Sequence, residues 1–270
     1  MWPMSSSPGN GEVLALEGIS KSYGPVQALE GVDFRVRAGE VVALVGDNGA
    51  GKSTLVKVIS GIHHADSGRV LFEGQPVAIA KPNDAVALGI ATVHQDLALC
   101  DNLDVVANLF LGREEIEHGT GEVLRSLDET DMERLSHEVL GSLAVTITDV
   151  RSEVGTMSGG QRQQVAIARS LLGKPMVMVL DEPTAALGVR QTAQVLDLIK
   201  RLRDQGQGVV VVSHNLANVF AVADRIVVLR LGKPAGDFDS ADVSEEIVVA
   251  AITGADAVVN RNGDTHGGAR

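Results

Sequence analysis

The sequence predicts an α/β fold with a mostly parallel sheet, an antiparallel β layer near the N-terminus and an inserted helical sub-domain. Apolar runs that suit buried strands alternate with helical segments, a pattern typical of a parallel sheet with helices on both faces. Strands with alternating polar and apolar residues precede them. Between Asp104 and about Leu143 the sequence is instead charged and helical, and its acid-rich stretches suit solvated helix faces.

The elements are expected in the following order. Alternating residues predict antiparallel strands at 14–19, 32–36, 69–72 and 77–79, the last two joined by a turn at 73–76. Continuous apolar runs predict buried parallel strands at 40–45, 90–93, 176–180 and 208–212, and a further strand is expected at 225–230. Between 181 and 208 a helix is expected to bury one face made of Val195, Leu196, Ile199 and Leu202. No internal repeat is visible, so the pattern describes a single module.

Composition narrows the class of protein. A formal net charge of −12 over 270 residues argues against a nucleic-acid partner, which requires a basic face. No apolar run approaches the roughly 18 residues needed to span a bilayer, and the first residues do not resemble a signal peptide. The single cysteine, Cys100, permits no internal disulfide and fits a reducing cytosol. We therefore expect an intracellular protein that reaches a membrane only through a partner.

Residues 46–54 read GDNGAGKST, a complete G-x-x-x-x-G-K-S pattern between a predicted strand and a predicted helix. Its glycines let several backbone N–H groups face one concave spot at the helix N-terminus, which forms an anion site. Lys52 is expected to reach the β- and γ-phosphates of a nucleoside triphosphate, and the Ser53 hydroxyl to ligate Mg²⁺. The predicted nucleotide contacts of this loop are Gly46, Asp47, Asn48, Gly49, Ala50, Gly51, Lys52, Ser53 and Thr54.

Asp181 and Glu182 follow a buried strand directly. Because ligands of such sheets bind outside the carboxyl ends of the strands, both carboxylates are expected at the phosphate pocket. Asp181 is expected to orient Mg²⁺ through water. Glu182 is the predicted general base, which positions and polarises the attacking water. A helix N-cap is the alternative for such acids, and the phosphate loop favours the catalytic interpretation.

Two further polar residues follow strand ends. His214 comes after the strand at 208–212, where its imidazole can hydrogen-bond a γ-phosphate and the attacking water. Gln95 comes after the strand at 90–93, where its amide can add an uncharged ligand to Mg²⁺ and contact that water. The other histidines, including His63 and the one beside Gln95, His94, are expected to be structural or on the surface.

The segment 157–172, MSGGQRQQVAIARSLL, predicts a helix that starts at Ser158. A Ser-Gly-Gly helix start is a second anion site, and one phosphate tail does not easily need two such sites from one chain. The physical inference is that Ser158, Gly159, Gly160 and Gln161 serve the nucleotide bound to another copy, and a simple Ser N-cap is the alternative.

With these motifs the chain resembles the nucleotide-binding subunits of ATP-binding cassette (ABC) transporters, from about Val13 to Gly254. The motifs that carry the resemblance stand in the order Tyr23, the phosphate loop, Gln95, MSGGQ, Asp181–Glu182 and His214. It implies a tail at 1–11, one ATPase domain at 12–254 with its helical sub-domain at about 96–172, and a second tail at 255–270. It also implies that Tyr23 stacks on the adenine ring of ATP.

The resemblance further implies a head-to-tail dimer of two identical chains holding two ATP molecules, with Ser158 and Gly160 of one chain completing the other's site. ATP binding would close this dimer, and hydrolysis at Glu182 would reopen it. Attached membrane subunits would convert the cycle into transport.

Several segments are similar to ATPases of bacterial sugar importers of the ribose, xylose and fructose type, namely 61–77, 94–96, 108–114 and 182–189. This similarity implies a permease and an extracytoplasmic sugar-binding protein as partners, at the cytoplasmic face of the cell membrane. The permease contact is expected at Leu97–Asn102.

Two residues depart from the family pattern. Met157 replaces a Leu, which conserves volume. Gly188 stands where an Asp normally contacts the partner subunit, which puts the coupling between the two sites in doubt but not hydrolysis. Two alternatives stay open: a soluble ABC ATPase that assembles an intracellular complex, and an importer subunit for a non-sugar cargo.

Overall fold

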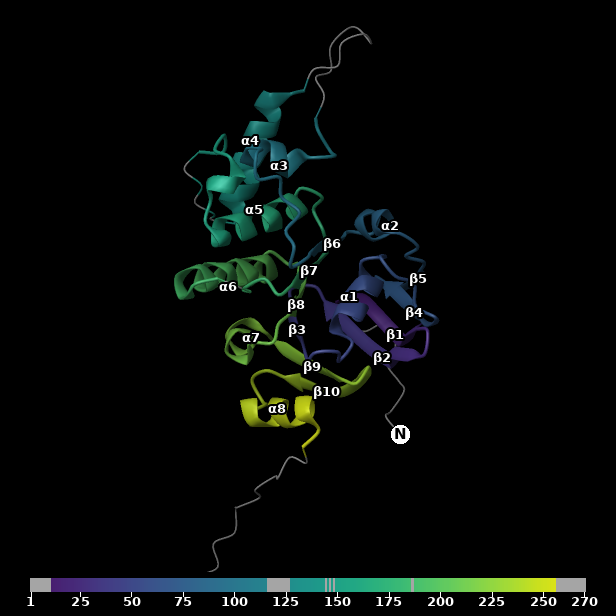
Figure 1. Ribbon diagram of the computed structural model, residues 1–270. Coiled ribbons are helices and arrows are strands. Elements are labelled where there is room, and N and C mark those ends of the chain that lie inside the picture. The colour runs from purple at the N-terminus through teal and green to yellow at the C-terminus, as the bar shows by residue number, and fades with distance from the viewer. Residues whose placement is uncertain are drawn as a thin grey trace, which may run out of the picture.

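The computed structural model describes residues 11–115, 127–143, 145, 147, 149–185 and 187–255. The tails predicted at 1–11 and 255–270 lie outside the described residues, apart from Gly11 and Ala255. Figure 1 shows the antiparallel strands β1, β2, β4 and β5 with α1 on one side, and α3, α4 and α5 gathered at one end.

A mostly parallel sheet forms the centre of the molecule. Its strands are β3 (Val41–Val45), β6 (Ile90–Val93), β7 (Val177–Asp181), β8 (Gly208–Val212), β9 (Arg225–Arg230) and β10 (Lys233–Asp239), in the order β10-β9-β3-β8-β7-β6. All neighbours pair in parallel except β10, which pairs antiparallel with β9. β3, β7 and β8 are rich in valine, whose branched side chain suits a pleated, buried surface. The predicted fold class is confirmed.

The antiparallel layer is a second sheet, with β1 (Glu12–Tyr23), β2 (Val26–Arg37), β4 (Ser67–Phe72) and β5 (Gln75–Val77) in the order β2-β1-β4-β5. β1 and β2 are 12 residues each, longer than the segments predicted from alternation. The register between them shifts at several points, and each bulge reverses which residues face inward. The alternation pattern therefore breaks although the strands continue.

The helices are α1 (Lys52–Ile59), α2 (Pro82–Ala87), α3 (Val105–Phe110), α4 (Glu129–Ser142), α5 (Gly159–Leu171), α6 (Val189–Asp204), α7 (Leu216–Val222) and α8 (Glu245–Thr253), with a 3₁₀ turn at Val154–Thr156. The expectation of helical sequence from Asp104 to about Leu143 is only partly correct. Residues 111–115 between α3 and α4 are not helical, since Gly112 adopts a positive φ of 79°. In the described part of the chain, no helix combines the length and apolarity needed to cross a membrane.

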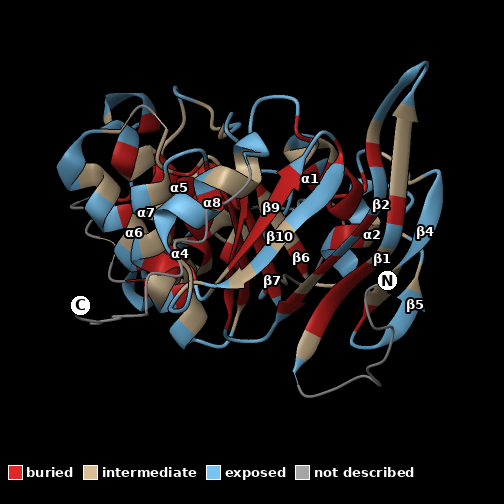
Figure 2. Ribbon diagram, turned by 90° about the horizontal axis from the view of Figure 1, so that it is seen from below, coloured by how far each residue is buried: buried red, intermediate tan, exposed pale blue. Residues whose placement is uncertain are grey.

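The core lies on both faces of the central sheet, and Figure 2 shows β9 largely buried and the edge strand β10 largely exposed. Along β3 the side chains alternate: Val41, Ala43 and Val45 pack with α5, α6 and α7, while Val42 and Leu44 pack with α1 and the antiparallel sheet. The second face is thus covered by a helix and a sheet together. This packing fixes the carboxyl end of β3 between the two layers.

Candidate active site

The carboxyl ends of three neighbouring strands bring the predicted chemistry together. Leu44 of β3 pairs with Val212 of β8, which in turn pairs with Asp181 of β7. The phosphate loop, Asp181–Glu182 and His214 therefore leave the sheet side by side, although they are far apart in the sequence. The register therefore explains how these strand ends reach one edge of the sheet.

The phosphate loop requires glycine at two positions for steric reasons. Gly46 has a φ of 152°, and a Cβ there would collide with the carbonyl oxygen of Leu229. Gly51 has a φ of 106°, and a Cβ would lie 2.7 Å from the carbonyl oxygen of Ala28. Gly49 has a φ of 78° but open space around it, so its requirement is conformational alone. The loop is thereby held against β2 and β9 as a concave turn of backbone.

Lys52 is the first residue of α1, and its side chain folds back over the loop. Its Nζ donates to the carbonyl oxygens of Gly46 at 2.7 Å and Asp47 at 3.0 Å. Burial lowers the pKa of Lys52, and the carboxylates of Glu182, Asp47 and Asp181 partly offset this effect. The ammonium is thus close to the carboxylates and sits at the mouth of the anion site.

Asp181 ends β7 in a half-buried position. Burial raises the pKa of Asp181, and the neighbouring Glu182 carboxylate raises it further, whereas His94, Lys52 and Lys57 oppose the shift. A carboxylate held at this energetic cost beside a phosphate loop suits a cation ligand. His94, to which the sequence assigned no role, is therefore part of the electrostatic surroundings of Asp181.

Glu182 adopts a left-handed backbone conformation with a φ of 51°, which is uncommon for a residue with a side chain. Its N–H donates to the carbonyl oxygen of Val212 at 2.9 Å, and its side chain is mostly buried. The Oε1 atom lies 2.9 Å from Nδ1 of His214, whose ring is largely exposed. The strained turn thus sends the Glu182 carboxylate toward the His214 side of the strand ends.

Gln95 follows β6, the neighbour of β7, two residues beyond the point where Val93 pairs with Leu180. It is exposed at the same edge of the sheet as Asp181. The predicted magnesium ligands Ser53, Gln95 and Asp181 offer a hydroxyl, an amide and a carboxylate, all of them oxygen donors. This donor set fits Mg²⁺, which binds proteins through few carboxylates and takes its remaining ligands from phosphates and water.

Tyr23 ends β1 at the tip of the β1–β2 hairpin, with its side chain partly exposed. Its ring meets the ring of His63 edge-on at 5.4 Å between centroids, and Nζ of Lys21 lies 5.7 Å from the Tyr23 centroid. His63, which was expected to be structural or on the surface, is partly exposed and packs against Tyr23. Only tertiary packing joins these residues, because they lie 40 positions apart in the sequence.

Ser158 is the N-cap of α5, whose start agrees with the helix start predicted from the sequence. Its Oγ accepts from the N–H of Gln161 at 3.3 Å, while the Gln161 side chain accepts from the N–H of Ser158 at 3.0 Å. Gly160 packs so closely on α6 that a Cβ would lie 2.9 Å from Cβ of Gln191. Figure 1 shows α5 with α3 and α4, away from α1. Ser158–Gln161 are thus not brought to the phosphate loop of the same chain.

Gly188, the departure noted above, is the N-cap of α6 and supplies no capping side chain. Gln191 compensates, because its Oε1 accepts from the N–H of Gly188 at 3.0 Å. The start of α6 is therefore anchored from inside the helix. A side chain three residues downstream, rather than the cap residue itself, holds this turn.

Comparisons with known proteins agree with this geometry. Residues 29–185 match the family model described as ABC transporter. The chain is 46% identical to the xylose/arabinose import ATP-binding protein XylG of Sulfolobus acidocaldarius, over 82% of this chain and 86% of that protein. It is 44% identical to the fructose import ATP-binding protein FrcA of Rhizobium meliloti, over 90% of this chain and 94% of that protein.

Solved structures show the same fold. The ATP-binding cassette MJ1267 of an ABC transporter, in its ADP conformation, has a TM-score of 0.76 and 28% identity, covering 90% of this chain and 96% of its own. A dimeric post-hydrolysis state of the cassette MJ0796 bound to ADP and Pi has a TM-score of 0.69 and 25% identity, covering 84% of this chain and 98% of its own.

Proposed function

Because this chain belongs to the ABC transporter family and is one of its ATPases, we propose that it energises the uptake of a sugar through a partner permease. The observation that supports this most strongly is the meeting of the phosphate loop, Asp181, Glu182 and His214 at one sheet edge, in a chain whose relatives are named as import ATP-binding proteins of xylose/arabinose and fructose. The cargo is assigned to the sugars from those relatives.

ATP is proposed to bind with its phosphates in the phosphate loop and its adenine on Tyr23. The first-turn N–H groups of α1 and the Lys52 ammonium offset the charge of the phosphates. Lys52 then exchanges its two carbonyl partners, on Gly46 and Asp47, for phosphate oxygens. Both carbonyls belong to the phosphate loop, so its Nζ is already close to the place proposed for the phosphates. Ser53, Gln95 and Asp181 hold Mg²⁺, which supplies charge neutralisation at the phosphates.

Glu182 is the proposed general base. Its carboxylate orients the attacking water and accepts its proton, and His214 hydrogen-bonds the γ-phosphate from the neighbouring strand. The hydrogen bond to Glu182 occupies Nδ1 of His214, and the other ring nitrogen, Nε2, can donate to a phosphate oxygen only when it also carries a proton. Gln95 contacts the same water from β6. Each group thus reaches the γ-phosphate from a different strand end.

The active assembly is proposed to be a head-to-tail dimer of two copies. Ser158–Gln161 form the start of α5, which Figure 1 shows apart from α1, so they are proposed to serve a nucleotide bound by a second copy. The dimeric state of the related cassette MJ0796 supports this arrangement. ATP then closes the dimer, and hydrolysis at Glu182 reopens it.

The permease is proposed to contact Leu97–Asn102, at the cytoplasmic face of the cell membrane, with an extracytoplasmic sugar-binding protein delivering the cargo. This segment follows Gln95 directly and joins the sheet edge to α3. Displacement of the segment by the permease would therefore move a residue of the active site. Substitutions at Leu97 or Leu99 should reduce transport-coupled ATPase activity and leave nucleotide affinity unchanged.

The proposal is tested by purifying tagged Glu182→Gln protein with ATP from detergent-solubilised native membranes and identifying its partners by mass spectrometry. This variant should hold ATP in the closed dimer and retain a polytopic permease. Lys52→Ala protein, which should not bind ATP, is the matched control for nucleotide-dependent capture. Recovery of soluble partners alone, with the protein absent from membranes, would refute the transport function and favour assembly of an intracellular complex.

A further inference from the structure

Arg169, near the C-terminal end of α5, binds the loop that follows Gln95. Its Nη1 donates to the carbonyl oxygen of Ala98 at 2.8 Å, and its Nη2 donates to that of Leu97 at 3.0 Å. One planar guanidinium therefore forms hydrogen bonds to the carbonyl oxygens of two consecutive residues. This geometry suits arginine and not lysine, whose ammonium is a point donor.

The guanidinium holds the loop through hydrogen bonds to backbone carbonyls. Arg169 is about half-buried, and burial lowers its pKa, with the charge of nearby Arg113 adding to the effect. Among the described residues no carboxylate forms an ion pair with Arg169. The two loop carbonyls accept the hydrogen bonds of its side chain, so the contacts of Arg169 act on the position of the loop.

The loop has a conformation that needs support. Ala98 adopts a φ of 48°, in the left-handed region that residues with a side chain rarely occupy. Its N–H is held by the Asp96 carboxylate at 3.2 Å, and its carbonyl is one of the two bound by Arg169. Gln95 immediately precedes this turn. The direction of the backbone at Gln95 therefore depends on the contacts that keep Ala98 in place.

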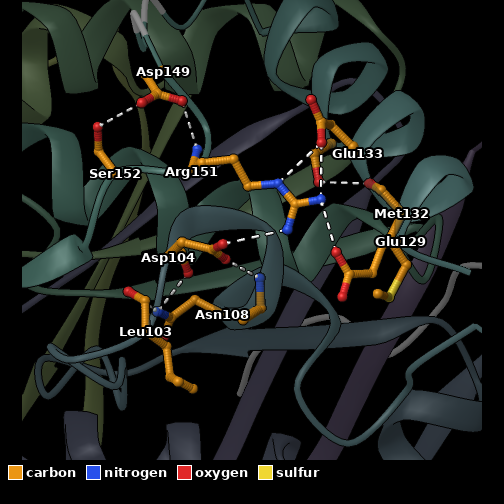
Figure 3. A network of polar contacts seen from close by, with 11 residues as sticks. Leu103, Asp104, Asn108, Glu129, Met132, Glu133, Asp149, Arg151 and Ser152 are labelled. Carbon is orange, nitrogen blue, oxygen red and sulfur yellow. Dashed lines mark hydrogen bonds and ion pairs between the residues drawn. The ribbon is translucent and has the colours of Figure 1, made fainter. Parts of the chain in front are cut away.

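Further contacts tie the rest of the loop to the region around α5. The Asp101 carboxylate forms an ion pair at 2.5 Å with Arg162, which lies about two turns before Arg169 on α5. The carbonyl oxygen of Asp101 accepts from the N–H of Gly155 at 2.9 Å. Leu103 accepts from the N–H of Val154 at 3.0 Å. Figure 3 shows that Arg151 forms ion pairs both with Asp104, at the end of this loop, and with Glu129 and Glu133 of α4. Residues 97–104 are thus fastened to the helical part of the molecule.

We propose that Arg169 is a positioning residue that fixes Gln95 relative to Ser158, so that the loop after Gln95 and the start of α5 move as one body. Ser158 and Arg169 lie at opposite ends of one helix, separated by about 16 Å along its axis. A helix of this length transmits displacement with little bending. The inference rests on the proposed roles of Gln95 and Ser158, and it adds the residue that couples them.

The test measures ATP hydrolysis and nucleotide affinity of the purified full chain carrying Arg169→Met. The turnover number kcat should fall by between about tenfold and a hundredfold, the loss expected when a water-positioning group is displaced by an ångström. The dissociation constant for ATP should stay unchanged, because the phosphate loop and Tyr23 belong to the other part of the molecule. Arg169→Lys, which keeps the cation but cannot bind two carbonyls in a fork, should recover only part of the rate.

A double-mutant cycle separates positioning from a general structural role. Combined with Gln95→Ala, the Arg169→Met change should cost little further activity, because both remove the same contact with the water. Arg113→Met, which removes a neighbouring guanidinium that binds no loop carbonyl, is the matched control and should leave kcat unchanged. Amide hydrogen exchange at residues 97–103 should accelerate in Arg169→Met and not in Arg113→Met.

Three results would overturn the inference: additive losses in the cycle, a parallel loss of ATP affinity, or an unchanged rate in Arg169→Met. If Gln95→Ala itself keeps full activity, the proposed role of Gln95 fails and the positioning role fails with it. None of these measurements depends on finding a permease, so failure of this inference is distinct from failure of the transport function.

Discussion

The Nδ1 atom of His214 lies 2.9 Å from the Oε1 atom of Glu182, so the two residues expected to face the attacking water are already in contact. One follows β8 and the other follows β7, and the parallel pairing of these strands brings them together. The mostly buried Glu182 carboxylate thereby orients the exposed His214 imidazole. The parallel pairing of β7 with β8 therefore sets the approach of these two side chains.

Glu182→Gln should lower kcat by roughly 10²–10⁴-fold, because an amide cannot accept the proton of the water. The affinity for ATP should stay within about twofold of wild type, since the amide keeps the size of the side chain and removes a charge that repels phosphate. Single-turnover hydrolysis and fluorescent-nucleotide titration measure the two quantities. A variant with nearly normal turnover would exclude Glu182 as the general base.

The raised pKa of Asp181 predicts a pH-dependent stability cost. The folded chain binds this proton more tightly than the unfolded chain, so the free energy of unfolding falls as the pH rises from the ordinary value of 3.8 through the raised one. The cost is fully present once the pH lies above the raised pKa. Asp181→Asn should therefore raise the Tm at pH 7 while abolishing Mg²⁺-dependent hydrolysis.

Thermal unfolding without nucleotide, at several pH values, checks this prediction. The gain in Tm should shrink as the pH is lowered toward the ordinary Asp pKa, where wild-type Asp181 is itself protonated. A lower Tm for Asp181→Asn at pH 7 would contradict it.

Gly51→Ala should abolish nucleotide binding, whereas Gly49→Ala should weaken it far less. Both positions have a positive φ, which costs alanine about 1–2 kcal/mol. At Gly51 the added Cβ also meets the carbonyl oxygen of Ala28 at 2.7 Å, so the loop must move away from β2. Isothermal titration with ATP measures both variants, and equal effects would mean that the close contact does not shape the loop.

Tyr23→Ala should weaken ATP binding by roughly tenfold, because stacking of a base on an aromatic ring is worth about 1–3 kcal/mol. Tyr23→Trp should keep the affinity, since it preserves the aromatic face. His63→Ala, which removes only the edge contact with the ring, should have a smaller effect than Tyr23→Ala. The same titration, repeated with inorganic triphosphate, distinguishes loss of base stacking from loss of phosphate binding: only ATP should respond.

Ser158→Arg should prevent ATP-dependent dimerisation of Glu182→Gln protein, because a large cation would occupy the surface offered to the second copy. Ser67→Arg, on the exposed antiparallel sheet, is the matched control and should still dimerise. Size-exclusion chromatography with light scattering reports the mass of each. Dimers of the Ser158→Arg double variant would place the interface elsewhere.

Local pattern was sufficient where the chemistry is contiguous in the sequence. GDNGAGKST at 46–54 and MSGGQ at 157–161 each specify a strand-to-helix or loop-to-helix turn, and the structure places α1 and α5 where these motifs predict. The lengths of β1 and β2 could not be predicted, because bulges shift the phase of alternation without ending the pairing. The contact of His63 with Tyr23 was missed for a different reason: no periodic signal links a residue after α1 to the tip of a hairpin.

The residue types and their order along the chain are enough to predict which groups follow which strands. How those groups meet depends on the fold. Strand order places β8 between β3 and β7, and so brings Lys52, Glu182 and His214 to one edge of the sheet, while Ser158 caps α5, which Figure 1 shows beside α3 and α4. The physical reason is that short-range pattern encodes local conformation, whereas strand register and side-chain packing depend on the whole core. Arg169, whose partners lie 71 and 72 positions away, belongs to this second category.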